Sequence, residues 1–283
     1  MEFNKKMPVR ILDPLTGARR NASVVEYRGV SKGPRLKRWT AGKRKQGGRN
    51  SSGRLTVRHR GGGHKQLYRM IAWGEEKENI PGRVELIEYD PNRSAFLARI
   101  VYRDGDRRYL LAWEGATAGQ AVLTSMQAEP TAGNRLPLER IPVGNSVFNV
   151  ELKPRQGGKI IRSAGSAAMV QEVSGAFAQL RLASGEIRLV PKEAWATIGQ
   201  VSNPDHRTER IGSAGRKRRM GWRPEVRGKA MNPVDHPHGG GEGHNPIGLK
   251  YPKTPTGKHA LGVKTRRPVK YSDRFVMKRR HKK

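Results

Sequence analysis

Hydrophobic positions in the middle of the chain follow the period of short β-strands. "RVELIEY" (83–89) places Val84, Leu86 and then Ile87 among charged neighbours, an imperfect but strand-like alternation. Next come the turn "DPNR" (90–93), "AFLARIVY" (95–102), the turn "DGD" (104–106) and "RRYLLAW" (107–113). Apolar runs separated by turn residues at hairpin spacing predict a meander of antiparallel strands.

A second series of strands is expected after the Pro- and Gly-punctuated stretch "AEPTAGNRLP" (128–137). Its members are "SVFNVEL" (146–152), "AAMVQEV" (167–173), "AFAQLRL" (176–182) and "EIRLV" (186–190), and the last three are separated by "SG" turns. Short, evenly spaced strands with little helix favour two small barrels over one large sandwich. We find no sequence repeat between the two series.

Both ends of the chain lack such a pattern. Residues 33–65 follow neither a helical period nor a strand period, and the region from Gly212 onward has the same character. Segments of this kind bury too little apolar area to offset the entropy of ordering, so we expect them to be extended and unfolded without a partner. The predicted division is a basic N-terminal extension (1–64), a first barrel (65–127), a second barrel (128–203) and a basic extended C-terminal arm (204–283).

Charge follows the same division. Residues 1–64 hold 17 basic and 3 acidic residues, residues 65–203 hold 18 and 15, and residues 204–283 hold 22 and 6. The formal net charge is +33, and repulsion between so many positive side chains would oppose compaction of the free protein. A polyanionic partner is therefore expected. Cysteine is absent, which excludes disulfides and thiolate metal sites. Neither a signal peptide nor a membrane span is expected, so we predict no membrane partner.

Aromatic residues among the cations indicate nucleic acid as the polyanion. Trp39, Tyr68, Trp222, Tyr251 and Tyr271 lie between basic residues and offer faces that can stack on bases or sugars. No recognition helix, zinc finger or basic zipper is present in the sequence. Small barrels with basic arms suit irregular, folded RNA, and we therefore predict a structural RNA-binding protein.

Several long motifs then point to a known family. "GGRNSSGRLTVRHRGGGHKQLYR" (47–69), "EYDPNRSAFLA" (88–98), "DGDRRYLLA" (104–112), "IPVGNSVFNVELKP" (141–154), "IRSAGS" (161–166) and "RGKAMNPVDHPHGGGEG" (227–243) resemble, in this order, the bacterial-type form of large-subunit ribosomal protein two. The resemblance implies a mainly β fold, with an OB-like barrel followed by an SH3-like barrel and both arms buried in large-subunit rRNA. It also implies a primary rRNA-binding protein near the peptidyl-transferase centre that reaches small-subunit rRNA at an intersubunit bridge.

The resemblance carries over to individual residues. Arg93 of "DPNRSA" and Arg162 of "RSAG" match arginines that contact rRNA from the two barrels, and both adjoin turns from which a fork of donors can grip phosphate. From the residues alone, a turn-capping or solvent-facing role is an equal alternative. The acidic loop "WGEEKEN" (73–79) departs from the basic stretch usual there, which argues against an rRNA contact at that loop. The other predicted rRNA-binding residues are Arg54, Arg58, Gly61, Gly62, Gly63, His64, Lys65, Tyr68, Arg69, Arg216, Lys217, Arg218, Arg219, Trp222, Arg227, Asn232, His236, His238, Gly239, Gly240, Gly241, Arg266 and Arg267.

The loop "AMNPVDHPHGGGEGH" (230–244) admits three interpretations. Its histidines and carboxylates could bind a metal ion, but no helical or hairpin scaffold for zinc ligands is legible, so no metal site is predicted. Asp235 could orient His236 as a general base, and the matching histidine of the family has been proposed to assist peptidyl transfer. We favour the third interpretation, in which His236 and His238 anchor the loop and its glycines let the backbone approach phosphates.

Three functional classes follow from these observations. The first is a structural ribosomal protein that is not an enzyme, with large-subunit rRNA and other ribosomal proteins as partners. The second is an RNA chaperone or assembly factor that leaves the finished particle, and the third is an enzyme centred on Asp235 and His236. No cofactor built by the protein is expected, although Mg²⁺ would accompany the bound rRNA. We expect a cytoplasmic ribosome, and the sequence leaves an organellar one open.

Overall fold

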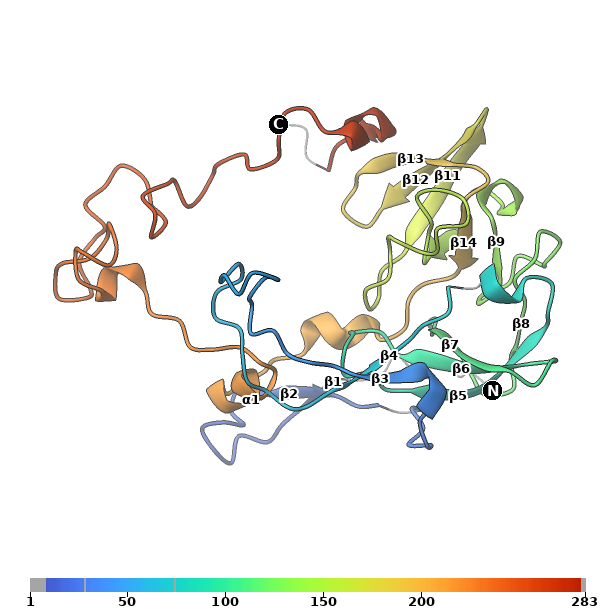
Figure 1. The fold of residues 1–283 in the computed structure, drawn as a ribbon, viewed down its shortest axis with the longest axis horizontal. Coiled ribbons are helices and arrows are strands. Elements are labelled where there is room, and N and C mark those ends of the chain that lie inside the picture. The colour runs from blue at the N-terminus through green and yellow to red at the C-terminus, as the bar shows by residue number, and fades with distance from the viewer. Residues whose placement is uncertain (1–8, 28, 74, 281–283) are drawn as a thin grey trace. The chain divides into compact units, whose positions relative to one another are not determined.

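A computed structural model of the chain describes residues 9–27, 29–73 and 75–280, and the remaining positions, including the first eight of the predicted N-terminal extension, lie outside the described residues. Figure 1 traces the chain and labels its strands and its α-helix. The chain divides into two compact units. The first unit combines residues 1–44, 65–214 and 272–283, and the second combines residues 45–64 and 215–271. Each unit is built from segments distant in sequence. Our four-part division along the chain stays a prediction.

The first predicted barrel contains a four-stranded antiparallel sheet in the order β7-β6-β5-β8. Its strands are β5 (Gly82–Glu88), β6 (Leu97–Tyr102), β7 (Arg107–Leu111) and β8 (Ala121–Val122). The three longer strands were expected from the sequence, and β8 was not. The register of β5 against β6 shifts between Val84 and Leu86, so that Val84 and Ile87 are both buried. This β-bulge explains why the apolar alternation of β5 is imperfect.

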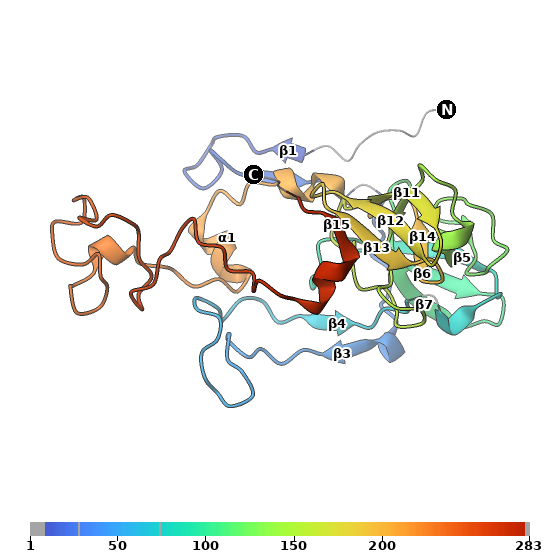
Figure 2. The same cartoon turned by 90° about the horizontal axis from the view of Figure 1, so that it is seen from above.

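The second predicted barrel is built on a larger antiparallel sheet in the order β15-β13-β12-β11-β10-β14-β9. The strands that the sequence predicted are β10 (Ser146–Phe148), β11 (Ala168–Ser174), β12 (Phe177–Leu182) and β13 (Ile187–Pro191). Those that it did not predict are β9 (Arg135–Pro137), β14 (Trp195–Ile198) and β15 (Val276–Lys278). Figure 2 shows β15 beside β13, to which it is paired through Ile187 and Arg188. The C-terminal end of the chain thus contributes a strand to this barrel. The mainly β fold with two barrels is confirmed.

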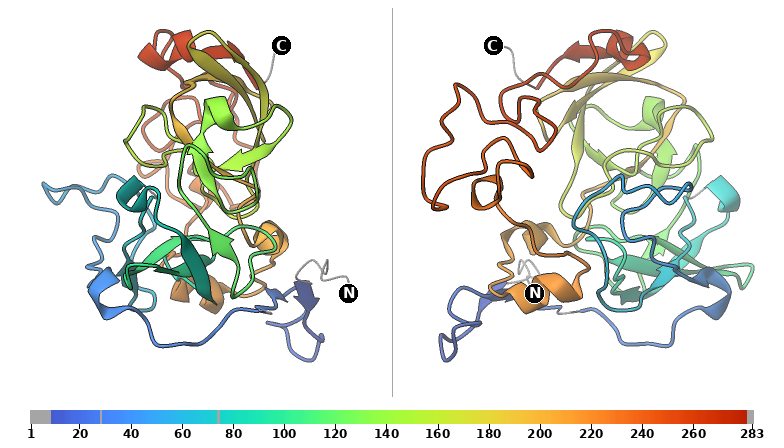
Figure 3. Two further views of the ribbon diagram at one scale, coloured as in Figure 1. Left: turned by 90° about the vertical axis from the view of Figure 1, so that its right-hand side faces the viewer. Right: turned by 60° about the vertical axis from the view of Figure 1, so that its left-hand side comes forward.

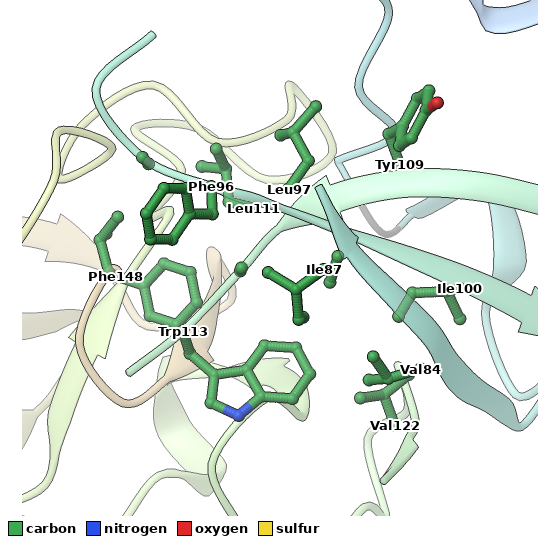
Figure 4. Close-up of a cluster of buried hydrophobic side chains, with 14 of the residues drawn as sticks. Val84, Ile87, Phe96, Leu97, Ile100, Tyr109, Leu111, Trp113, Val122 and Phe148 are labelled. Atoms are coloured by element: carbon green, nitrogen blue, oxygen red, sulfur yellow. The ribbon is translucent and has the colours of Figure 1, made fainter. Parts of the chain in front are cut away.

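The hydrophobic core of the first barrel extends across the boundary between the two barrels. Val84, Ile100, Tyr109 and Trp113 pack together there with Phe148 of β10 and with Val201, which follows β14. Figure 4 shows the Phe148 ring next to Trp113 and Phe96. A separate cluster that includes Leu136, Val147, Leu180 and Val190 fills the second barrel. The two barrels therefore share buried side chains.

Part of the N-terminal extension also belongs to the first barrel. Val30, Leu36 and Trp39 pack against its core, and the Tyr109 hydroxyl accepts a hydrogen bond from the Leu36 amide at 2.9 Å and donates one to the Glu88 carboxylate at 3.1 Å. Burial raises the pKa of the Glu88 carboxyl above its ordinary value, against the lowering effects of Tyr109 and Arg99. Two strand pairs lie in the N-terminal half, β1 (Val9–Ile11) with β2 (Ser23–Val25) and β3 (Thr40–Gly42) with β4 (Leu67–Arg69).

Helix is scarce. The one α-helix among the described residues is α1 (Ala214–Arg219), and the 3-10 helices are η1 (Lys37–Trp39), η2 (Glu75–Lys77), η3 (Leu138–Arg140), η4 (Pro204–Thr208), η5 (Gly228–Ala230) and η6 (Tyr271–Phe275). No helix in this described part of the chain has the length and apolar character that crossing a bilayer requires.

The second unit has little regular structure, as the orange-to-red trace after α1 shows (Figure 3). It is nevertheless compact, because residues 45–64 form hydrogen bonds with residues 219–224. The sequence did not indicate this pairing, because contacts between segments more than 150 positions apart leave no local periodicity. The expectation that the arms are unfolded without a partner stays a prediction.

Candidate nucleic-acid interface

An open groove of about 510 Å³ lies on the first unit, where the two barrels meet. It brings together Arg93, which follows the turn after β5, and Arg162, which precedes β11. Two aromatic side chains, Tyr68 of β4 and Trp73, line the same groove. The remaining lining residues are Asn92, Ser94, Leu111 and Ser163. Cations next to exposed aromatic faces are the chemistry that holds single-stranded or irregular nucleic acid.

The orientation of Arg93 is fixed by the turn that carries it. Its Nε donates to Oδ2 of Asp90, whose side chain is fully buried, and its Nη2 donates to the Arg69 carbonyl at 3.1 Å. Asp90 also faces the Arg69 guanidinium at 3.7 Å, so one buried carboxylate anchors two cations. The Arg93 guanidinium carbon lies 5.6 Å from the centre of the Tyr68 ring. Arg93 is thus a preorganised donor beside an aromatic face.

Arg162 is held more loosely and is exposed. It follows Ile161, whose φ of 58° places the loop backbone in the left-handed region. Its Nη1 donates to the Gly158 carbonyl at 3.1 Å, and its guanidinium carbon lies 4.8 Å from the centre of the Trp73 ring. Arg162 therefore caps its turn through the bond to Gly158 and also faces solvent, as the two alternative interpretations of the sequence expected. The guanidinium has further donors that can reach a phosphate.

Hydrogen bonds between the barrels hold the groove in shape. The Ser202 hydroxyl accepts from the Phe96 amide at 3.0 Å, and the Asn203 side chain donates to the Ser94 carbonyl at 2.8 Å. The Ser94 hydroxyl in turn accepts from the Ala164 amide at 3.1 Å. Since these bonds tie the loop of Arg93 to the loop of Arg162, the separation between the two loops is set by the fold.

Several residues that line the groove were not predicted from the sequence. Trp73 was set aside because the loop that it begins is acidic, yet its ring stacks with Arg162. Asn92 bonds the Leu67 carbonyl through Nδ2 at 2.6 Å and accepts from Lys43 Nζ at 2.8 Å. A lone tryptophan before a charged loop was the available signal for Trp73. Asn92 and Ser94 had no signal beyond their closeness to Arg93.

Most of the other predicted residues belong to the second unit. Gly61 to His64 pair with residues 219–224, and the Trp222 ring is covered on one face by the Arg60 guanidinium, whose carbon is 3.3 Å from the ring centre. The side chains of Arg54, Arg58, Arg227, Arg266 and Arg267 are exposed. The cations of α1 are Arg216, Lys217, Arg218 and Arg219, with no buried residue among them. Lys65 and Arg69 belong to the first unit, and neither is among the residues that line its groove.

The histidine loop is held together by its own hydrogen bonds. His236 is 7% exposed, and its Nδ1 accepts a hydrogen bond from the His238 amide at 3.0 Å. His238 Nε2 accepts from the Lys253 amide at 2.8 Å. Each imidazole therefore places one ring nitrogen against a backbone amide, and these two contacts hold the loop together. Gly228 packs against the His236 ring so closely that a Cβ there would lie 2.4 Å from the ring Cε1.

The glycines of this loop also serve close backbone packing. A Cβ at Gly239 would lie 2.1 Å from the Asn232 carbonyl oxygen, which accepts hydrogen bonds from the Asp235 and His236 amides. Gly240 has a φ of 86° and donates to the Met231 carbonyl at 3.1 Å, and Gly241 has a φ of 139°. Over the ranges that the structure describes, no three His, Asp or Glu side chains gather as a metal site requires. The geometry is that of a folded loop with close internal packing.

Comparison with known protein families agrees with this chemistry. Residues 36–124 match the model described as "Ribosomal Proteins L2, RNA binding N-terminal domain". Residues 131–257 match the model described as "Ribosomal Proteins L2, C-terminal domain". The two matches follow one another and together cover most of the chain, and the groove residues from Tyr68 to Arg162 lie within them. The chain therefore belongs to the ribosomal protein L2 family, whose members are RNA-binding proteins of the large ribosomal subunit.

Proposed function

We propose that the chain is a primary rRNA-binding protein of the large subunit and that the groove between its barrels is a principal contact with rRNA. The observation that carries this proposal is the convergence of Arg93 and Arg162, from two barrels, on a groove lined by Tyr68 and Trp73. Each guanidinium has donors in a planar fork that matches phosphate oxygens. The Tyr68 ring, which is 42% exposed, can stack on an unpaired base or a sugar.

The site within the ribosome follows from the family resemblance. We place the protein near the peptidyl-transferase centre, where it supports peptide-bond formation and tRNA binding indirectly. Its further partners are other ribosomal proteins and small-subunit rRNA at an intersubunit bridge, through which it supports subunit association. Mg²⁺ ions would accompany the bound rRNA, and the ribosome would be the cytoplasmic one.

The test is the salt dependence of rRNA binding by an Arg162→Ala variant. If Arg162 neutralises a phosphate, its loss should reduce the slope of log affinity against log salt concentration by about 1. Arg83→Ala is the matched control, because Arg83 is an exposed arginine of β5 outside the groove and its loss removes the same charge. Equal slopes for Arg162→Ala and the unmodified protein would contradict the proposal.

A role as an assembly factor would require the protein to leave the finished particle. Pulse labelling followed by purification of mature subunits separates the two functions. A ribosomal constituent remains in the particle even at moderately high salt, whereas an assembly factor is recovered in the free pool.

Direct catalysis by His236 is disfavoured by its geometry. Its Nδ1 is occupied by the His238 amide, its ring is packed against Gly228, and Asp235 is exposed. The His236→Ala variant should therefore leave the rate of peptide-bond formation nearly unchanged in particles that retain the protein. A fall of several orders of magnitude at full occupancy would establish a catalytic role.

A further inference from the structure

Residues 59–64 and 219–224 form a short antiparallel ladder, which we name the clasp. The Gly61 amide donates to the Gly221 carbonyl, the His64 amide to the Arg219 carbonyl and the Arg223 amide to the His59 carbonyl, each at 3.0 Å. Arg60 and Trp222 are paired across the ladder. The His59 ring adds a contact to the Pro224 carbonyl at 3.0 Å. Two segments that are more than 150 positions apart in the sequence thus form one hydrogen-bonded element.

Side chains at the clasp fit this pairing. A Cβ on Gly63 would lie 2.7 Å from both the Arg219 carbonyl oxygen and the Gly221 nitrogen, so only glycine allows the approach. The Arg60 guanidinium carbon lies 3.3 Å from the centre of the Trp222 ring, a cation–π contact across the ladder. The clasp therefore has packing and hydrogen bonds of its own, without any nucleic acid.

The clasp also organises positive charge. Residues 45–64 include five Lys or Arg and no Asp or Glu. Lys45 Nζ donates to the Gly62 carbonyl at 2.7 Å, and Arg218 Nη1 donates to the Trp222 carbonyl at 3.0 Å. Both side chains donate to carbonyl oxygens of the ladder, and these hydrogen bonds keep the two positive charges close to the ladder. Cations from both segments are then concentrated on one element, as phosphate binding requires.

We propose that the clasp forms before RNA is bound and makes the two basic segments a single RNA-binding module, in place of two independent tails. The partner is a folded RNA whose phosphate backbone is contacted by both segments at once. This inference rests on the proposed rRNA binding. It also replaces, for these stretches, the expectation that order comes only from RNA. Preassembly removes part of the ordering cost that separate disordered tails would meet on binding.

Hydrogen exchange tests whether the clasp forms before RNA is bound. The sample is the full-length protein from which nucleic acid has been removed at high salt. The amides of Gly61, His64 and Arg223 should exchange more slowly than those of unstructured peptides. Exchange at the rate of an unfolded chain would overturn the inference, because the clasp would then not exist without RNA.

A variant at Gly63 tests whether the clasp makes the two segments a single RNA-binding module. Gly63→Ala introduces the clash with the backbone of residues 219–221, whereas Gly53→Ala, at a φ of 76° in the same segment, has nothing within 4 Å and controls for backbone strain. The apparent dissociation constant for large-subunit rRNA rises in inverse proportion to the binding-competent fraction. If about one tenth of the Gly63→Ala molecules remain clasped, affinity should fall about tenfold. Loss of protection with unchanged affinity would overturn the proposal.

A reversible crosslink provides a comparison within one sequence. The chain has no cysteine, and antiparallel partners such as Arg60 and Trp222 have Cα atoms about 4.5–5.5 Å apart, within the range of a disulfide. The double variant Arg60→Cys/Trp222→Cys should bind rRNA more tightly when oxidised than when reduced, because the bond holds the clasp closed at the same net charge. Weaker binding by the oxidised form would show that RNA binds the open segments.

These outcomes separate the inference from the function on which it rests. If the unmodified protein fails to bind large-subunit rRNA, the proposed function fails. If it binds rRNA while its clasp amides are unprotected in the free state, the proposed function remains and only the inference fails.

Discussion

Replacing Glu151 with alanine should destabilise the first unit strongly. Glu151 is fully buried, and its Oε1 accepts from Arg135 Nη2 at 2.6 Å. Its Oε2 accepts from the backbone amides of Arg155 at 2.9 Å and Trp195 at 3.3 Å. Glu151→Ala therefore removes the Glu151 carboxylate from the buried Arg135 guanidinium and from the two backbone amides that donate to it.

The expected magnitude follows from this burial. Arg135 is 3% exposed, so solvent provides little screening of the charge left behind. Breaking one side of such a buried pair costs about 3–5 kcal/mol. For a cooperative unit of this size, that loss lowers the melting temperature by about 6–20 °C. It is also a large share of the roughly 5–15 kcal/mol by which domains are stable.

Urea unfolding followed by tryptophan fluorescence measures this loss, because Trp195 lies directly beside Glu151. Glu151→Gln should lie between the unmodified protein and Glu151→Ala, since it keeps an acceptor but not the charge. Glu172→Ala is the control, because Glu172 is an exposed glutamate of β11, and it should shift stability by about 0.5 kcal/mol or less. A loss below about 1 kcal/mol for Glu151→Ala would refute the reasoning about the buried pair.

Three further predictions concern the first unit. The pKa of Glu88 is raised in the folded state, so the difference in unfolding free energy between the unmodified protein and Glu88→Gln should favour the unmodified protein most in acid. This advantage should fall as pH rises from the ordinary pKa of 4.5 through the raised pKa, and unfolding measured across pH tests it. Lys77→Met should raise the pKa of Asp104, which the Lys77 hydrogen bond lowers, as carboxylate NMR titration would show; an unchanged titration would contradict that bond. Gly133→Ala puts a Cβ 2.5 Å from the Trp113 ring and should cost about 1–3 kcal/mol in unfolding free energy, whereas Gly119→Ala, at a similar φ but in open space, should cost less.

The strands that could be predicted were those with local apolar patterns. β6, β7, β11, β12 and β13 come from runs rich in apolar residues that are bounded by turn residues, and these two local signals were sufficient to predict them. β14, with the sequence "WATI", is buried at every position and has no alternation to detect. β15 depends on pairing with β13, nearly ninety positions earlier, and no local signal reports such a contact.

The site shows the same limit. Arg93 and Arg162 were identified through their motifs, but the sequence did not bring them together, because the hydrogen bonds from Ser202 and Asn203 that join their loops are long-range. Trp222 was expected to offer a free face, and the structure covers one of its faces with Arg60. The expectation that His236 and His238 anchor their loop against rRNA stays a prediction, while the hydrogen bonds by which the two rings accept from backbone amides required coordinates.

The shared core has a consequence for how the protein is made. Phe148 and Val201 complete the apolar cluster that begins at Val84, so the first barrel lacks part of its interior until translation has passed residue 201. The nascent chain would then expose Trp113 and its neighbours on the emerging polypeptide for the time needed to synthesise nearly ninety residues. By contributing Phe148 and Val201 to this cluster, the second barrel makes completion of the first depend on its own synthesis.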